Sequence, residues 1–112
     1  MESLSVIIAL SALAQEHRLS IFRFLVQSGR NGVPAGKIGE KLQIPLSTLS
    51  FHLKELKQAG LIECCREGRT LFYSVNFGSM NALVAYLTEN CCQGQSEDCS
   101  TPAFCVQEEE GN

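Results

Sequence analysis

Residues 45–60, which read PLSTLSFHLKELKQAG, decide the fold of this chain. Leu49, Leu53 and Leu56 follow one another at intervals of four and three residues, which places them on one stripe of a helix. Pro45 suits the first helical turn, because its missing N–H would have no partner there, and Gly60 suits the left-handed position just past the end. The stretch predicts a short helix with one buried face and one presented face.

The presented side of this helix has small hydroxyls near its beginning and lysines further along. A helix in the major groove of DNA uses such a mixture to reach base edges and phosphates. A solvated surface helix can have the same composition, so the face alone leaves both interpretations open. The candidate DNA-contacting residues on it are Ser47, Thr48, Ser50, Phe51, Lys54 and Lys57.

Length and composition indicate one small folded domain. The chain has 112 residues, of which 45% are hydrophobic. No run approaches the roughly 18 apolar residues of a membrane span, and the acidic Glu2 stands where a signal peptide would be basic. We therefore expect a cytoplasmic protein with no membrane partner.

The charges are unevenly distributed along the chain. The net charge is −3, yet all nine basic residues lie in residues 1–88, together with only six of the acidic ones. This part has a balance of +3, the sign that contact with phosphates requires. The remaining six acidic residues lie in the last 24 residues. An acidic total therefore does not exclude a nucleic-acid partner.

Helical patterns precede the central stretch. Residues 4–13 are apolar almost all round and need cover on more than one side, which a dimer partner could supply. A core helix follows Gln15 and ends near Ser28, and Pro34 can open a short third helix. The tight connection at residues 43–44 then predicts a helix-turn-helix.

A hairpin and a last helix follow Gly60. Residues 61–66 and 70–75 are β-prone and predict a hairpin wing. Arg66 and Arg69 at its tip could contact phosphates or a minor groove, although exposed arginines are also common on hairpins. The last helix, capped by Asn76, has an apolar stripe that we expect to join the N-terminal helix in a dimer interface: Phe77, Met80, Leu83, Val84 and Leu87.

The order of these elements, together with SFHLKELKQAGLI at residues 50–62 and REGR at residues 66–69, resembles the ArsR family of winged-helix repressors. The resemblance covers roughly residues 5–90. It implies a mainly α fold with a β-hairpin wing, and a homodimer that binds double-stranded operator DNA until a metal or metalloid binds. Family members often have a basic residue at the position of Phe51, so the base preference stays open.

His52 joins the DNA-binding candidates at this point. A lone histidine in such a helix more often forms a hydrogen bond or contacts a phosphate than binds a metal ion. With this domain placed at residues 1–90, residues 91–112 form an acidic, cysteine-containing tail that we expect to be partly flexible.

Six cysteines are many for a cytosolic chain of this length. Clustered thiols in that compartment more often bind metals or sense oxidants than form disulfides. Cys64 and Cys65 are adjacent in a strand, so they point to opposite faces and cannot jointly hold one ion; we expect one in the core and one exposed. A chelate can form among the others, which lie at the end of the last helix and in the tail: Cys91, Cys92, Cys99 and Cys105.

Thiolates select thiophilic ions. Trivalent arsenic prefers three thiolates in a pyramid, whereas structural Zn²⁺ takes four ligands in a tetrahedron. The four C-terminal cysteines are enough for either site. Residues 31–45 contain no cysteine, so the helix-turn-helix arsenic site of some family members is absent. The segment at residues 90–99 instead resembles the arsenical-resistance branch with a C-terminal cysteine site. The resemblance implies that As(III), or alternatively Sb(III), is the inducer and that its ligands are Cys91, Cys92 and Cys99, with Cys105 as a spare or fourth ligand.

Rival interpretations remain. One is a thiol-redox or Zn²⁺/Cd²⁺-sensing repressor of the same fold. A small thiol enzyme such as an arsenate reductase would need a cysteine activated at a helix N-terminus or beside a cation. Cys91 and Cys92 follow a helix C-terminus amid acids, which disfavours a thiolate, so we expect no enzyme. A protein–protein adaptor that uses the winged helix without DNA is also compatible with the sequence.

Overall fold

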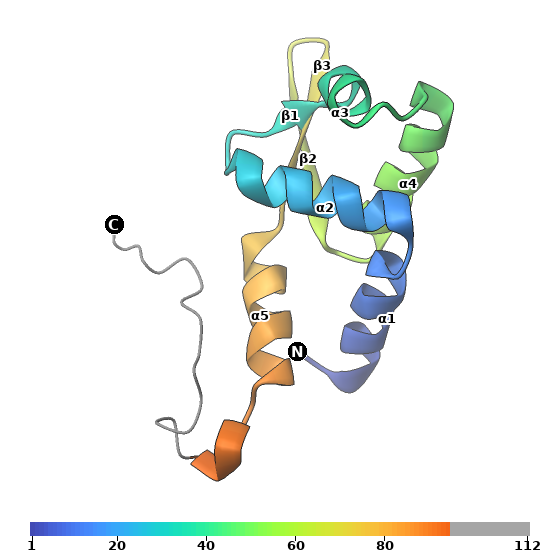
Figure 1. Cartoon of the computed structure of the whole chain (residues 1–112). Helices are drawn as coiled ribbons and strands as arrows, with labels where there is room; N and C mark the ends of the chain where they lie inside the picture. Colours follow the sequence, from blue (N-terminus) through green and yellow to red (C-terminus); the bar gives the residue numbers. More distant parts are fainter. Residues whose placement is uncertain (95–112) are drawn as a thin grey trace.

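The computed structural model describes residues 1–94, and Figure 1 shows their arrangement. The predicted winged helix-turn-helix, mainly helical with a hairpin wing, is confirmed. In chain order the elements are α1 (Ser3–Leu13), α2 (Glu16–Ser28), β1 (Val33–Pro34), α3 (Ala35–Leu42), α4 (Leu46–Gln58), β2 (Ile62–Glu67), β3 (Thr70–Val75), α5 (Phe77–Leu87) and the 3₁₀ helix η1 (Cys91–Gly94).

The core forms where α2 crosses the molecule between α1, α4 and the sheet (Figure 1). Ile21 and Leu25 of α2 are fully buried there. The predicted stripe of α4 is confirmed, because Leu49, Leu53 and Leu56 are all part of this core. The apolar periodicity of α4 thus determines which of its sides remains exposed.

The connection from α3 to α4 depends on a close approach at Gly39. A Cβ atom there would lie 3.0 Å from the carbonyl oxygen of Ile44 and 3.3 Å from Cδ2 of Leu49. The backbone N–H of Ile44 donates to the carbonyl of Gly39 at 3.0 Å, and Gln43 is left-handed with φ 58°. Pro45 is the N-cap of α4 and not its first helical residue, so the helix begins one residue later than predicted, at Leu46. The absence of a side chain at Gly39 lets the two helices meet.

The sheet contains one strand more than the predicted hairpin. Its order is β1-β3-β2, with both pairs antiparallel. In β1, Val33 pairs with Tyr73 and Pro34 with Phe72. Two residues are too few to show an alternating pattern, which explains why the sequence did not reveal β1. The hairpin itself is confirmed, with Glu67 opposite Thr70.

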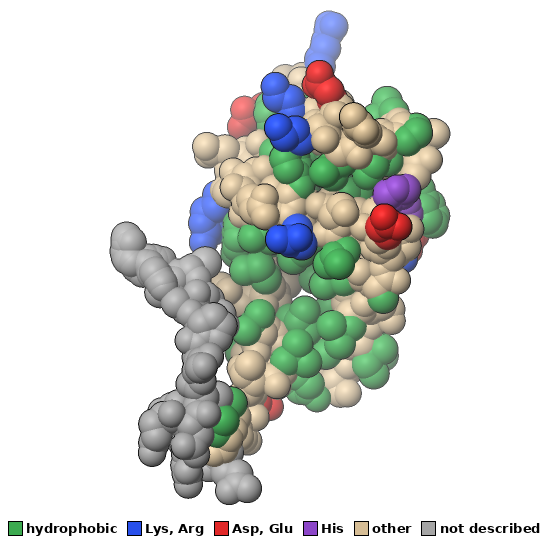
Figure 2. Space-filling view, viewed as in Figure 1, with side chains coloured by type: hydrophobic (Ala, Val, Ile, Leu, Met, Phe, Trp, Pro, Cys, Tyr) green, Lys and Arg blue, Asp and Glu red, His purple; other side chains and the backbone are tan. Residues whose placement is uncertain are grey.

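The predicted cap of α5 is also confirmed, since the side chain of Asn76 accepts from the N–H of Ser79 at 3.1 Å. Much of the apolar surface of the two terminal helices is uncovered. Ile7 of α1 is 56% exposed, and Leu87 of α5 is 58% exposed. Figure 2 shows the hydrophobic side chains gathered over the part of the molecule where α1 and α5 lie. This surface has the character expected of a dimer interface.

The expected domain boundary at residue 90 lies between α5 and η1. Most of the expected tail is outside the described residues, so this division stays a prediction. Within residues 1–94, no helix is long and apolar enough to cross a membrane.

Candidate DNA-binding surface and cysteine segment

The exposed side of α4 presents Ser47, Ser50, Phe51 and Lys54, which we call the recognition face. Neighbours on this face are three or four residues apart, so their side chains form one continuous surface. Lys57 is exposed one turn further along α4, whereas Thr48 is half-buried. The face combines hydroxyl donors, a charge and an aromatic ring.

Two arginines extend the candidate surface onto the wing. Arg66 lies near the end of β2, and Arg69 lies in the turn that connects β2 to β3. Both side chains are exposed. Figure 1 shows the hairpin projecting beyond α3. Such an arm can place positive charge along a phosphate backbone. Their contact with DNA remains a prediction.

His52 differs from its exposed neighbours, because the structure buries its side chain instead of exposing it on the recognition face. Its side chain is 7% exposed and its ring meets the rings of His17 and Phe51 edge-on, each at 5.4 Å between centroids. Nδ1 of His52 lies 3.4 Å from Nη1 of Arg18, whose Nε donates to the carbonyl of Ala12 at 2.6 Å. His52 is therefore a hydrogen-bonding residue, one of the two roles expected of it, and its contact with DNA stays a prediction.

This environment favours the neutral form of the His52 imidazole. A guanidinium has only donors, so Nδ1 of His52 must be the unprotonated, accepting nitrogen in its contact with Arg18. Burial first, then the charges of Arg18 and His17, lower the pKa of His52 below 6.5, while Glu55 acts in the opposite direction. Sequence reasoning missed Arg18 and His17, since 34 residues separate Arg18 from His52 and no local pattern signals the contact.

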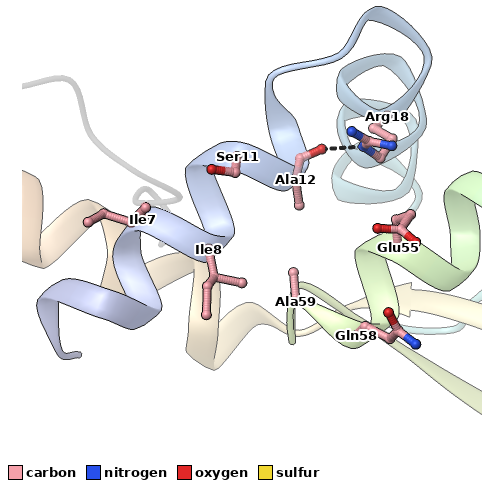
Figure 3. A pocket seen from close by; sticks show the side chains of 8 residues that line it. All are labelled: Ile7, Ile8, Ser11, Ala12, Arg18, Glu55, Gln58 and Ala59. Carbon is pink, nitrogen blue, oxygen red and sulfur yellow. Dashed lines mark hydrogen bonds between the residues drawn. The ribbon is translucent and has the colours of Figure 1, made fainter.

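A groove of about 470 Å³ lies beside this cluster, between α1, the start of α2 and the end of α4. Figure 3 shows Arg18 and Glu55 at one end of it and Ile7 and Ile8 of α1 at the other. It connects the exposed apolar side of α1 with the helix that carries the recognition face. Its lining residues are Ile7, Ile8, Ser11, Ala12, Arg18, Glu55, Gln58 and Ala59.

The two cysteines of the wing differ in exposure, as adjacent residues of a strand should. Cys64 is half-buried opposite Tyr73 of β3, and Cys65 is exposed. Burial, and then the neighbouring Cys64, raise the pKa of Tyr73. The expectation that Cys64 and Cys65 do not form a joint site fits this geometry.

The C-terminal pair Cys91 and Cys92 is exposed in η1, with Sγ atoms 3.3 Å apart. We expected this pair at the end of the last helix. The structure separates it from α5, because α5 ends at Leu87 and the chain turns through Asn90, whose φ is 57°. Two sulfurs in contact can still act as ligands of one ion.

The other two candidate ligands, Cys99 and Cys105, lie outside the described residues. Within residues 1–94, no three His, Cys, Asp or Glu side chains gather as a metal site would require. The structure thus contains two of the three predicted ligands, and the complete site stays a prediction.

Comparison with known proteins identifies the group of regulators to which this arrangement belongs. A family model described as a helix-turn-helix domain matches residues 13–65. The transcriptional activator HlyU of Vibrio cholerae is 31% identical over 91 residues, which are 81% of this chain and 82% of HlyU. The chain belongs to the ArsR/HlyU family of helix-turn-helix transcriptional regulators.

Two further relatives of this ArsR/HlyU regulator are an operon repressor and a homodimeric DNA-binding domain. The arsenical resistance operon repressor of Bacillus subtilis is 34% identical over 92 residues, which are 79% of this chain and 84% of that protein. The homodimeric winged helix-turn-helix DNA-binding domain of Mb0332 from Mycobacterium bovis is 28% identical, with a TM-score of 0.60 over 81% of this chain and 84% of that one. These relatives are regulators, so the prediction that the chain is no enzyme is confirmed.

Proposed function

We propose that this ArsR/HlyU regulator is a homodimeric repressor that leaves its operator DNA when Cys91, Cys92 and Cys99 bind trivalent arsenic. The observation that carries the proposal is the 3.3 Å separation of the exposed Cys91 and Cys92 sulfurs. Two exposed thiols this close together could both bind one ion, and thiolates select thiophilic ions such as trivalent arsenic.

The likeness to the arsenical resistance operon repressor of B. subtilis supports a role in the response to arsenic. Trivalent arsenic would supply a soft centre that holds three thiolates at once. This chain contributes Cys91 and Cys92 from η1, and Cys99 seven residues further along the sequence. Antimony(III), which also prefers thiolates, is the alternative inducer.

Dimerisation through α1 and α5 would present the recognition face twice. A two-fold dimer of helix-turn-helix domains contacts half-sites about 34 Å apart, one turn of DNA, so we expect a palindromic operator. Ile7 and Leu87 on the uncovered apolar surface would be buried between the two copies.

The position of the cysteine pair suggests how an inducer bound there could change the affinity for DNA. The backbone N–H of Cys91 donates to the carbonyl of Thr88 at 2.9 Å, so the pair follows the exposed end of α5 directly. Three thiolates joined there would constrain the chain beside the proposed dimer interface. The dimer then has two arrangements, one that binds DNA and one that does not. Operator binding weakens by the difference between the inducer's binding free energies for these two arrangements, commonly about 1–3 kcal/mol.

The test is an arsenite titration of the operator-bound dimer, followed by fluorescence anisotropy. The double variant Cys91→Ser, Cys92→Ser should bind DNA as the wild type does but stay bound when arsenite is added. The matched control is Cys64→Ser, Cys65→Ser, which removes an adjacent pair from the wing and should be released normally. A Cys91/Cys92 variant that binds arsenite stoichiometrically and leaves its operator at the wild-type concentration would refute the proposal.

A second candidate function is a thiol-redox regulator, and the short distance between the Cys91 and Cys92 sulfurs favours it too. Two thiols would give up two protons and two electrons to hydrogen peroxide, so that one S–S bond forms, the O–O bond breaks and two water molecules leave. Intact mass separates the candidates, because oxidation lowers the mass by two hydrogens whereas arsenite raises it. Release by peroxide with no response to arsenite would favour this second function, and release by Zn²⁺ or Cd²⁺ alone would favour a metal sensor.

A further inference from the structure

Phe51 adds a large apolar side chain to the recognition face. It is 55% exposed beside Ser47, Ser50 and Lys54, all of which are polar and exposed. A large apolar side chain open to water gains free energy when another apolar group covers it. The polar neighbours suit a partner whose surface is mostly polar and has one apolar group at this point.

The ring of Phe51 is held from behind. It lies edge-on to the ring of His52, with centroids 5.4 Å apart and planes at 65°. His52 is itself fixed between Arg18 and His17 of α2. A side chain whose position is set before binding loses less freedom when it forms a contact. The Phe51 ring thus has an aromatic neighbour, while more than half of its side chain stays exposed.

The major groove of DNA offers an apolar group that such a ring can cover. Thymine alone among the four bases presents a methyl group there, at C5, and Phe is one of the side chains that contact it. The two serines beside Phe51, Ser47 and Ser50, can bond to several base edges, and Lys54 can reach a phosphate. Base bonding by the serines and phosphate contact by Lys54 do not require an aromatic ring beside them, so Phe51 needs a separate role.

We propose that Phe51 selects thymine at one position of each operator half-site by packing against its C5-methyl group. This inference rests on the proposed operator binding and deepens it, because it names the chemical group that the regulator reads. The same contact would accept the methyl group of 5-methylcytosine at that position.

The experiment removes the methyl group without changing base pairing. Operator duplexes are prepared with each thymine in turn replaced by deoxyuridine, and their affinities for the full-length dimer are measured by anisotropy. At one position per half-site, uracil should weaken binding about fourfold, and at both half-sites together about fifteenfold. At the same position, 5-methylcytosine should bind about fourfold more tightly than cytosine.

Two variants assign the effect to Phe51. Phe51→Ala should bind the thymine and uracil duplexes equally. Leu46→Ala is the matched control: Leu46 is 61% exposed on the same helix, but it borders a hollow against Gly36, Gly39 and Glu40 of α3. This variant should keep the fourfold difference. Circular dichroism establishes that both variants are folded.

The outcomes are distinguishable. If the wild type binds every uracil duplex as tightly as its thymine counterpart, or if the difference persists in Phe51→Ala, the inference is wrong while operator binding stands. If the wild-type dimer binds no DNA from its own promoter, the proposed function and this inference both fail.

Discussion

Replacing Lys54 by alanine should lower the salt dependence of operator binding without changing the preferred sequence. Lys54 is exposed on the recognition face, and its flexible ammonium group reaches a phosphate more readily than it reads a base. Each phosphate that a protein neutralises contributes about 0.9 to the slope of log affinity against log salt concentration. A homodimer presents Lys54 twice, so Lys54→Ala should lower the slope by about 1.8.

This change is large enough to measure. Between 50 and 200 mM salt, a slope smaller by about 1.8 reduces the accompanying loss of affinity by about twelvefold. Anisotropy titrations of wild type and variant at four or five salt concentrations give the slope directly. Arg23→Ala is the charge-matched control, because Arg23 is exposed on α2, outside the recognition helix and wing.

Two results would refute this reasoning about Lys54. One is an unchanged slope, or a decrease no greater than that of Arg23→Ala. The other is a changed preference at one fixed base pair, which would mean that Lys54 reads a base. Ser47→Ala is expected to show that second behaviour, since a hydroxyl on the recognition face can bond to a base edge.

Three further predictions concern assembly and stability. Ile7→Glu should shift the protein from dimer to monomer in sedimentation at micromolar concentration, because the 56% exposed Ile7 belongs to the proposed interface. The free energy of unfolding should decrease as the pH falls below about 6.5: the lowered pKa of His52 means that the unfolded chain binds more protons there, and His52→Gln should flatten this dependence in urea titrations. Leu56→Ala should reduce the free energy of unfolding by about 2–5 kcal/mol, since Leu56 is fully buried, and an unchanged melting temperature would contradict this.

The sequence by itself determined the elements whose signals are local. The spacing of Leu49, Leu53 and Leu56 sets the buried side of α4, because a helix repeats every 3.6 residues. Asn76 caps α5, and Gly60 takes the left-handed conformation after α4 with a φ of 81°. Each of these signals depends on a few neighbouring residues, so no tertiary contact was needed to predict it.

Only the tertiary structure decided which of the candidate DNA-contacting side chains are exposed and where the cysteine pair lies. His52 carries the same sequence signal as its exposed neighbours, but contacts with Arg18 and His17 from α2 place it in the core. Cys91 is off the face of α5 because the chain leaves the helix after Leu87. The strand β1 exists because Val33 and Pro34 find partners in β3, about 40 residues away. These features arise from contacts between distant segments, which local patterns do not encode.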